Sequence, residues 1–102
     1  MQKVALITGG GSGFGKGLAR ELVIAGWTVY AADKNAKAAK SAAELGAIPL
    51  TMDVTSDESV KAGVKKIIRE QKHLDLLVAN AGFGNFSSVE ETSPEKVREI
   101  FE

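Results

Sequence analysis

The chain has 102 residues, of which 44% are hydrophobic and 25% charged, and it contains no cysteine. Thirteen basic residues balance thirteen acidic ones without a long run of either sign, which gives no electrostatic reason to expect a nucleic acid or a membrane as partner. The lack of cysteine excludes a disulfide framework and a thiolate metal site and fits a reducing compartment. We therefore expect one small cytoplasmic domain over residues 1–102, with no metal site and no membrane span.

Short apolar runs alternate with stretches of helical period, which is typical of βαβ units and a parallel sheet. Residues 3–8 form a continuous apolar run, as in a strand buried on both faces. The next segment is predicted to be a helix that ends at Gly26, a position suited to a left-handed cap. Its apolar stripe is Phe14, Leu18, Leu22 and Ala25. A second strand over 28–32 then leads to Asp33.

The middle of the chain predicts a second helix and a third strand. Asn35 is placed to cap an alanine-rich helix that runs through Leu45 and is closed by Gly46. Residues 47–52 then form a short apolar strand. Because this strand contains Pro49, which cannot donate to a ladder, we expect it at an edge of the sheet.

The remaining segments continue the alternation. Thr55 and Glu58 have the spacing of a capping box, which predicts a helix that fades near residues 72–73. Residues 74–79 are the most apolar strand of the chain. A loop follows, and residues 93–94, Ser-Pro, read as the start of a last helix.

A glycine-rich turn connects the first strand to the first helix. Residues 8–15 read TGGGSGFG, with the glycine spacing Gly-x-x-x-Gly-x-Gly. Glycines let the backbone approach a pyrophosphate, and a helix start offers free N–H groups to an anion. Gly17 would permit close helix packing, whereas Lys16 is misplaced for a P-loop lysine. The alternative is a flexible turn between strand and helix.

Asp33 stands at the end of the second strand, twenty residues after Gly13. A carboxylate at that point can accept hydrogen bonds from the ribose hydroxyls of adenosine and would repel a 2′-phosphate, which favours NAD over NADP. Lys34 acts in the opposite direction, because a cation could offset a phosphate. Alternatively, Asp33 is a turn residue before a helix.

Polar and small residues also follow the third and fourth strands, and ligands of open α/β sheets gather at the carboxyl ends of strands. Asp53 ends the third strand, although an acid at the start of a helix is nearly as good an explanation. Residues 80–82, Asn-Ala-Gly, follow the fourth strand. Small residues there leave room for a cofactor, and the asparagine can bridge neighbouring strand ends.

Together these motifs resemble the N-terminal, cofactor-binding half of a short-chain dehydrogenase/reductase. The matching segments are Thr8-Gly9-x-x-x-Gly13-x-Gly15, Asp33, Asp53-Val54-Thr55 and Asn80-Ala81-Gly82. The resemblance covers essentially the whole chain. It implies a three-layer, Rossmann-like α/β fold, truncated to about four parallel strands in the order 3-2-1-4.

The resemblance also implies a set of contacts with a dinucleotide. The residues concerned are Gly9, Ser12, Gly13, Phe14, Gly15, Asp33, Asp53, Val54, Asn80, Ala81 and Gly82. Those of the glycine turn would line the pyrophosphate and ribose. Asp33 would hold the adenine ribose, Asp53 with Val54 would lie at the adenine, and residues 80–82 would flank the nicotinamide-side ribose.

Members of this family carry their catalytic serine and Tyr-x-x-x-Lys pair in the following half of the fold, beyond Glu102, so no catalytic residue is predicted here. Tyr30-x-x-x-Lys34 is a literal match, but four residues of strand span ~13 Å, against ~6 Å on a helix face. We therefore reject it. The chain would be part of an NAD-dependent alcohol or carbonyl oxidoreductase. Alternatively, it would be a half-Rossmann module without catalysis, which holds a dinucleotide or nothing and self-associates.

Other polar and aromatic candidates are weaker. No base adjoins Ser87 or Ser88, so they are interpreted as solvated loop serines. His73 is interpreted as a residue at a helix end, where the dipole favours it. Phe83 and Phe86 could line a substrate pocket or pack the loop onto the sheet.

The strand 74–79 has a consequence for association. In the family's strand order its neighbour on one side comes from the missing half, which would leave an apolar edge unpaired. Such an edge is a template for pairing with another chain. We therefore expect a homo-oligomer formed through this strand.

Overall fold

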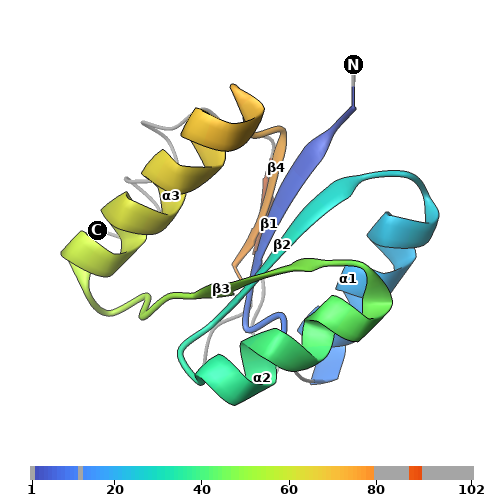
Figure 1. The fold of residues 1–102 in the computed structure, drawn as a ribbon, viewed down its shortest axis with the longest axis horizontal. Coiled ribbons are helices and arrows are strands. Elements are labelled where there is room, and N and C mark those ends of the chain that lie inside the picture. Colours follow the sequence, from blue (N-terminus) through green and yellow to red (C-terminus); the bar gives the residue numbers. More distant parts are fainter. Residues whose placement is uncertain (1, 12, 80–87, 91–102) are drawn as a thin grey trace.

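A five-stranded sheet in the order β3-β2-β1-β4-β5 runs through the centre of the molecule (Figure 1). The computed structural model describes residues 2–11, 13–79 and 88–90. The elements are β1 (Val4–Thr8), α1 (Gly13–Ile24), β2 (Thr28–Asp33), α2 (Ala36–Ser41), the 3₁₀ helix η1 (Ala42–Leu45), β3 (Ile48–Thr51), α3 (Asp57–Gln71), β4 (Leu76–Ala79) and β5 (Ser88–Glu90). No helix in these ranges is long and apolar enough to cross a membrane.

The first four strands are parallel. β1 pairs with β2 on one side and with β4 on the other, and β2 pairs with β3. The predicted order 3-2-1-4 is confirmed, and so is the prediction that the strand with Pro49 lies at an edge. Asn35 caps α2 by accepting from Lys37 N and Ala38 N, as expected.

Helices cover both faces of the sheet, with α3 on one and α1 and α2 on the other (Figure 1). Side chains of a strand alternate between the faces, so β1 directs Val4 and Leu6 toward α3, and Ala5 and Ile7 toward α1. All five residues of β1 are buried. This arrangement confirms the three-layer fold.

The two faces differ in side-chain size. The α3-side cluster consists mostly of large residues: Val4, Leu6, Tyr30, Ala32, Leu50, Met52, Val60, Val64, Ile67, Leu74 and Leu77. The α1-side cluster is rich in alanine: Ala5, Ile7, Ala19, Val29, Ala31, Ala42, Ala47 and Val78. Small side chains let helix backbones come close to a sheet, so the second face suits the tight packing described below.

The apolar stripe of α1 was predicted only in part. Leu18 and Leu22 pack against the α1-side cluster, but Phe14 is 62% exposed and Ala25 is exposed as well. The fully buried residues of α1 are Gly15 and Ala19. Because these small residues bring the backbone close to the sheet, the buried face centres on them and Phe14 and Ala25 lie outside it.

Gly17 does not have the packing role predicted for it. A Cβ atom added at Gly17 would meet nothing within 4 Å, and the residue is exposed. Close packing in α1 therefore depends on Gly15 and Ala19, which lie on the helix face opposite to Gly17.

The start of α3 also differs from the prediction. The N-cap is Ser56, whose side chain accepts a hydrogen bond from Ser59 N at 3.2 Å. The proposed cap, Thr55, instead donates to the Asp53 carboxylate from both its backbone N and its Oγ1. The predicted capping box of Thr55 and Glu58 is therefore wrong, because the Thr55 hydroxyl is hydrogen-bonded to Asp53 and does not cap α3.

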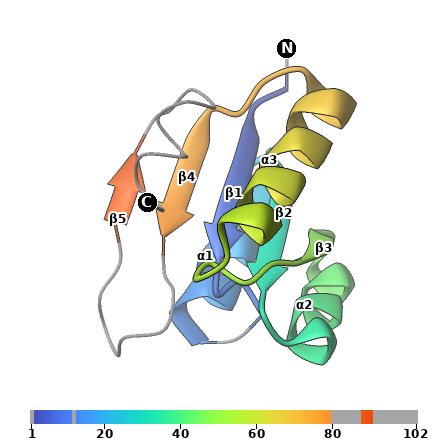
Figure 2. The same cartoon turned by 90° about the vertical axis from the view of Figure 1, so that its left-hand side faces the viewer.

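The edge of β4 is not unpaired. β5 lies antiparallel beside it, with Leu77 opposite Glu90, Val78 opposite Val89 and Ala79 opposite Ser88 (Figure 2). This pairing corrects both the expected bare edge and the interpretation of Ser88 as a loop residue. Residues 88–90 of the same chain thus supply backbone hydrogen-bonding partners along this side of β4.

We predict that Ser56→Ala lowers the free energy of unfolding by about 1 kcal/mol, the usual loss for an N-cap side chain. Thermal or urea unfolding of the purified variants would measure it. Glu58→Ala is the matched control, since glutamine could still form a capping box, and it should cost less because Glu58 is exposed and is not part of the observed cap. A larger loss of stability at Glu58 than at Ser56 would contradict the Ser56 cap and support the capping box of Thr55 and Glu58.

Candidate functional site

The turn between β1 and α1 lies at the carboxyl end of the central strand. Gly9 and Gly13 have φ angles of 66° and 56°, in the left-handed region where a side chain is unfavourable. The side chain of Thr8, which is buried, donates to Val78 O at 3.4 Å and so ties the start of the turn to β4. Two glycines are therefore required by backbone conformation, one at each end of the turn.

Gly10 and Gly11 are required for a different reason, which is space. A Cβ atom at Gly10 would lie 2.9 Å from Ala31 Cβ and 3.1 Å from Ile7 O. A Cβ atom at Gly11 would collide with the backbone carbonyl group of Ala38 in α2. Gly10 N also donates to Ala32 O at 3.0 Å. The turn is thus packed against β2 and α2 and is not a flexible connection.

Among the described residues, the space beside Gly13 is open. An added Cβ at Gly13 would meet nothing within 4 Å of it, and α1 begins at this residue with the N–H groups of its first turn unbonded within the helix. Open space in front of a helix N-terminus suits an anion such as a pyrophosphate. The described part of the turn therefore fits a dinucleotide, whereas Ser12 lies outside the described residues.

Asp33 connects the second strand to this turn. It is half-buried at the end of β2, and its Oδ2 accepts from Gly11 N at 3.3 Å. Its Oδ1 accepts from Asn35 N at 3.0 Å, which is the turn role that the sequence left open. Lys34 beside it is exposed. Asp33 is thus a turn residue, and it also contacts the glycine turn. This second contact places its carboxylate where a dinucleotide bound at the carboxyl ends of β1 and β2 would lie.

Asp53 is engaged mainly in its own turn. Oδ1 accepts from Thr55 Oγ1 at 2.6 Å and from Thr55 N at 2.9 Å, and these hydrogen bonds hold the pKa of the carboxyl below its usual value. Val54 is half-buried and packs against the α3-side cluster. These contacts favour the structural alternative for Asp53. The adenine contacts of both residues stay a prediction.

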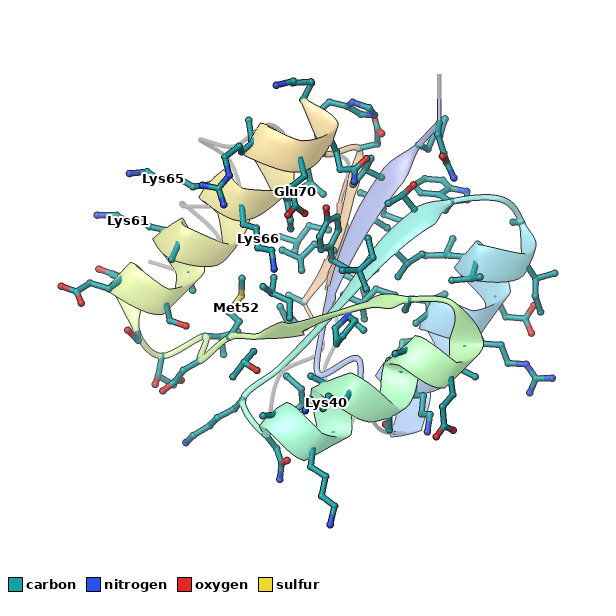
Figure 3. The ribbon with its side chains drawn as sticks, in the orientation of Figure 1. Lys40, Met52, Lys61, Lys65, Lys66 and Glu70 are labelled. Atoms are coloured by element: carbon teal, nitrogen blue, oxygen red, sulfur yellow. The ribbon has the colours of Figure 1, made fainter. Side chains whose placement is uncertain are left out.

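The rejection of Tyr30-x-x-x-Lys34 as a catalytic pair is supported by the position of each side chain. The Tyr30 ring is fully buried, and its hydroxyl donates to Glu70 Oε1 at 2.6 Å and accepts from Gln71 Nε2 at 3.0 Å. Figure 3 shows Glu70 of α3 directed toward the sheet. Burial, followed by the Glu70 hydrogen bond, raises the pKa of Tyr30. This tyrosine fastens α3 to the sheet, and Lys34 is exposed beyond the strand.

His73 lies near the amino ends of β1 and β4. It follows α3, and its Nε2 lies 2.9 Å from Gln2 O and 3.0 Å from Asp75 Oδ2. Asp75 Oδ2 also accepts from Val4 N at 2.8 Å. His73 thus lies at a helix end, as predicted, and links it to the start of β1. Within the described ranges no three His, Asp or Glu residues are arranged to hold a metal ion.

The structure brings some of the predicted site residues together. Gly9, Gly13 and Asp33 lie at the carboxyl ends of β1 and β2, whereas Asp53 belongs to a separate turn after β3. Gly15 is buried against the sheet and Phe14 is exposed. The remaining predicted residues, Asn80, Ala81, Gly82, Phe83, Phe86 and Ser87, lie outside the described residues.

Sequence reasoning missed two residues that shape the turn from outside it. Ala38 and Ser41 of α2 contact Gly11, the first through its backbone and the second through Oγ. The only available signal was the run of small residues in α2, AKAAKS. Composition of this kind predicts a closely packed helix but does not say what packs against it.

We predict that Thr55→Val raises the pKa of Asp53 toward its usual value, because the shorter of the two hydrogen bonds to its carboxylate is lost. The titration of the Asp53 carboxyl carbon by NMR would measure it. A lowered pKa contributes stability above the unfolded-state pKa that is lost as pH falls through the folded-state pKa, so the variant should lose less stability in acid. Thr51→Val, an exposed neighbour, is the control; an unchanged Asp53 pKa in Thr55→Val would contradict the assignment.

Comparison with known proteins agrees with this geometry. The family model for short chain dehydrogenase matches residues 3–102. A hydroxynaphthalene reductase of Aspergillus fumigatus is 35% identical over 97% of this chain and 39% of its own length, and an L-fucose dehydrogenase of Bos taurus is 39% identical over 98% and 38%. The chain thus spans about two fifths of these relatives.

Solved structures resemble the fold as well. The crystal structure of a 3-ketoacyl-(acyl-carrier-protein) reductase from Brucella melitensis, complexed with NADH, superposes with a TM-score of 0.70 at 35% identity, over 74% of this chain and 32% of that one. The matched family, the sheet order and the glycine turn all lead to one assignment. The chain belongs to the short chain dehydrogenase family.

Proposed function

We propose that this chain is the cofactor-binding part of an oxidoreductase that transfers hydride between a nicotinamide cofactor and an alcohol or carbonyl substrate. Family membership implies a nicotinamide cofactor, which would supply or accept the hydride. The observation that carries the proposal is the packed glycine turn, which opens onto the start of α1 and is joined to Asp33 at the end of the next strand.

The chain's own residues have binding roles in this proposal. The N–H groups at the start of α1 would hold the pyrophosphate, since the side of Gly13 is open to it. Asp33 would accept from the adenosine ribose, because a carboxylate has about four acceptor sites and, among the described residues, two of them are taken by backbone N–H groups. No catalytic role is assigned to a residue of this chain.

We propose NAD as the preferred cofactor. The negative charge of Asp33 would oppose the 2′-phosphate of NADP, and the similar reductase from Brucella melitensis was crystallised with NADH. Lys34 favours NADP but is exposed, so solvent screens its charge. A cytoplasmic location is part of the same proposal, because a chain without cysteine suits a reducing compartment.

The second candidate function is a half-Rossmann module that binds the dinucleotide without taking part in catalysis. The described features that support binding, the glycine turn and Asp33, need no catalytic residue for that role. Both candidates share the binding step, so the first experiment addresses that step alone.

We expect NAD to bind at least tenfold more tightly than NADP, a difference of about 1.4 kcal/mol in binding free energy. Calorimetric titration of the 102-residue chain would measure both. Asp33→Asn keeps an oxygen acceptor but removes the charge. It should reduce the ratio of the NADP to the NAD dissociation constant, mainly because NADP binds more tightly. Lys34→Ala is the control and should weaken NADP only. If NAD does not saturate the chain, the proposed function fails; if NADP binds more tightly, only the cofactor preference fails.

Self-association through residues 74–79 remains a proposal, now with an added requirement. β5 occupies the edge of β4, so a second chain would have to displace it. We expect light scattering to show dimers whose fraction rises with concentration, and Val89→Pro, which removes a backbone donor from β5, to increase that fraction. A single monomeric species for both chains across the concentration range would end the proposal.

A further inference from the structure

We propose that Ser41 of α2 is a positioning residue of the dinucleotide site, which holds the Gly11 peptide group in the conformation that binds the pyrophosphate. The inference rests on the proposed function above. Ser41 has no place in the glycine motif and is thirty residues from Gly11 in the chain. Its role follows from how the β2–α2 segment surrounds that single glycine.

Both polar backbone groups of Gly11 are bonded by side chains of the β2–α2 segment. Gly11 N donates to Asp33 Oδ2 at 3.3 Å, and Ser41 Oγ donates to Gly11 O at 3.2 Å. The same hydroxyl lies 2.7 Å from Ala38 O, so its one hydrogen is shared between two carbonyl oxygens. Gly11 is therefore held from either side, by β2 through its N–H and by α2 through its carbonyl.

Packing reinforces these two bonds. Gly11 is buried, and a Cβ atom there would collide with the Ala38 backbone. The helix itself is fixed in place, because Asn35 caps its start and Ala39 and Ala42 are buried on the sheet. A fixed helix can therefore transmit its position to the turn through Ser41.

The turn needs such support because of its composition. Glycine loses more conformational entropy on ordering than any other residue, and residues 9, 10, 11 and 13 are all glycine. A site that is ordered before its ligand arrives avoids paying this entropy on binding. External hydrogen bonds to Gly11 supply that order without adding a side chain to the turn.

A purely local role for Ser41 is the alternative. A serine near a helix end commonly bonds to the carbonyl of the preceding turn, as Ser41 does with Ala38 O. If that were its whole function, its removal would change the stability of α2 and leave the glycine turn and the ligand unaffected. The experiment therefore has to measure the turn itself.

The test uses the full 102-residue chain with Ser41→Ala, Ser41→Thr and Thr51→Ala. Alanine removes the hydroxyl and is a good helix former, threonine keeps the hydroxyl, and Thr51 is an exposed hydroxyl of β3 that serves as control. Amide hydrogen exchange at Gly11 reports the turn without ligand. Titrations with NAD and with adenosine, which lacks the pyrophosphate, report binding.

In Ser41→Ala we expect exchange at Gly11 to rise and NAD affinity to fall, each by about two- to tenfold, the range for one neutral hydrogen bond. Adenosine affinity should stay unchanged, and Ser41→Thr and Thr51→Ala should behave like the original chain. If Ser41→Ala does not fold, Ser41→Cys keeps the volume with a weak donor and should show the same two changes.

The outcomes separate this inference from the function on which it rests. Unchanged exchange at Gly11 in Ser41→Ala overturns the inference, whatever the ligand does. Equal losses of NAD and adenosine affinity overturn it too, because they indicate a general structural effect. If the original chain binds no NAD, the proposed function fails, and a faster exchange at Gly11 then shows a support for the turn with no binding role, which also overturns the inference.

Discussion

The position of β1 between β2 and β4 is the constraint on which the rest of the structure depends. β1 is buried along its whole length and pairs in parallel on both sides, so its carboxyl end must open at the same edge as those of its neighbours. The glycine turn and Asp33 meet at this edge because Thr8 is in register with Ala32, one residue before Asp33. The chemistry of the candidate site thus begins as a matter of strand register.

Unequal faces of the sheet explain why the turn can be so tightly packed. Alanine predominates beneath α1 and η1, and Ala31 on this face is the residue that a side chain at Gly10 would touch. On the opposite face, Met52 and Tyr30 belong to the cluster that packs against α3, and Figure 3 shows Met52 between this helix and β3. The face with small side chains is the one that must admit a glycine turn and two helix backbones, and the other face supplies most of the large apolar contacts.

Much of the fold could be predicted from the sequence because it depends on patterns that act locally. Buried strands read as apolar runs, and Asn35 caps its helix as its position predicts. The errors arose where two local solutions compete. Thr55 could cap α3 or join the turn of Asp53, and spacing alone does not decide between them. The pairing of β5 with β4 escaped prediction because no local sequence pattern specifies which strand residues 88–90 pair with.

Asp33 and Asp53 show how far a motif can be read into a site. Each is an acid at or just after the carboxyl end of a parallel strand. Strand position alone therefore predicts equally for both that they contact a bound cofactor. Asp53 bonds to Thr55, in its own turn, whereas Asp33 reaches Gly11, twenty-two residues earlier. This long-range hydrogen bond joins the glycine turn to the end of β2, so that the position of one depends on the other. The functional unit is therefore the β1–α1 turn together with the β2–α2 segment that holds it, which a search for glycine spacing alone would not delimit.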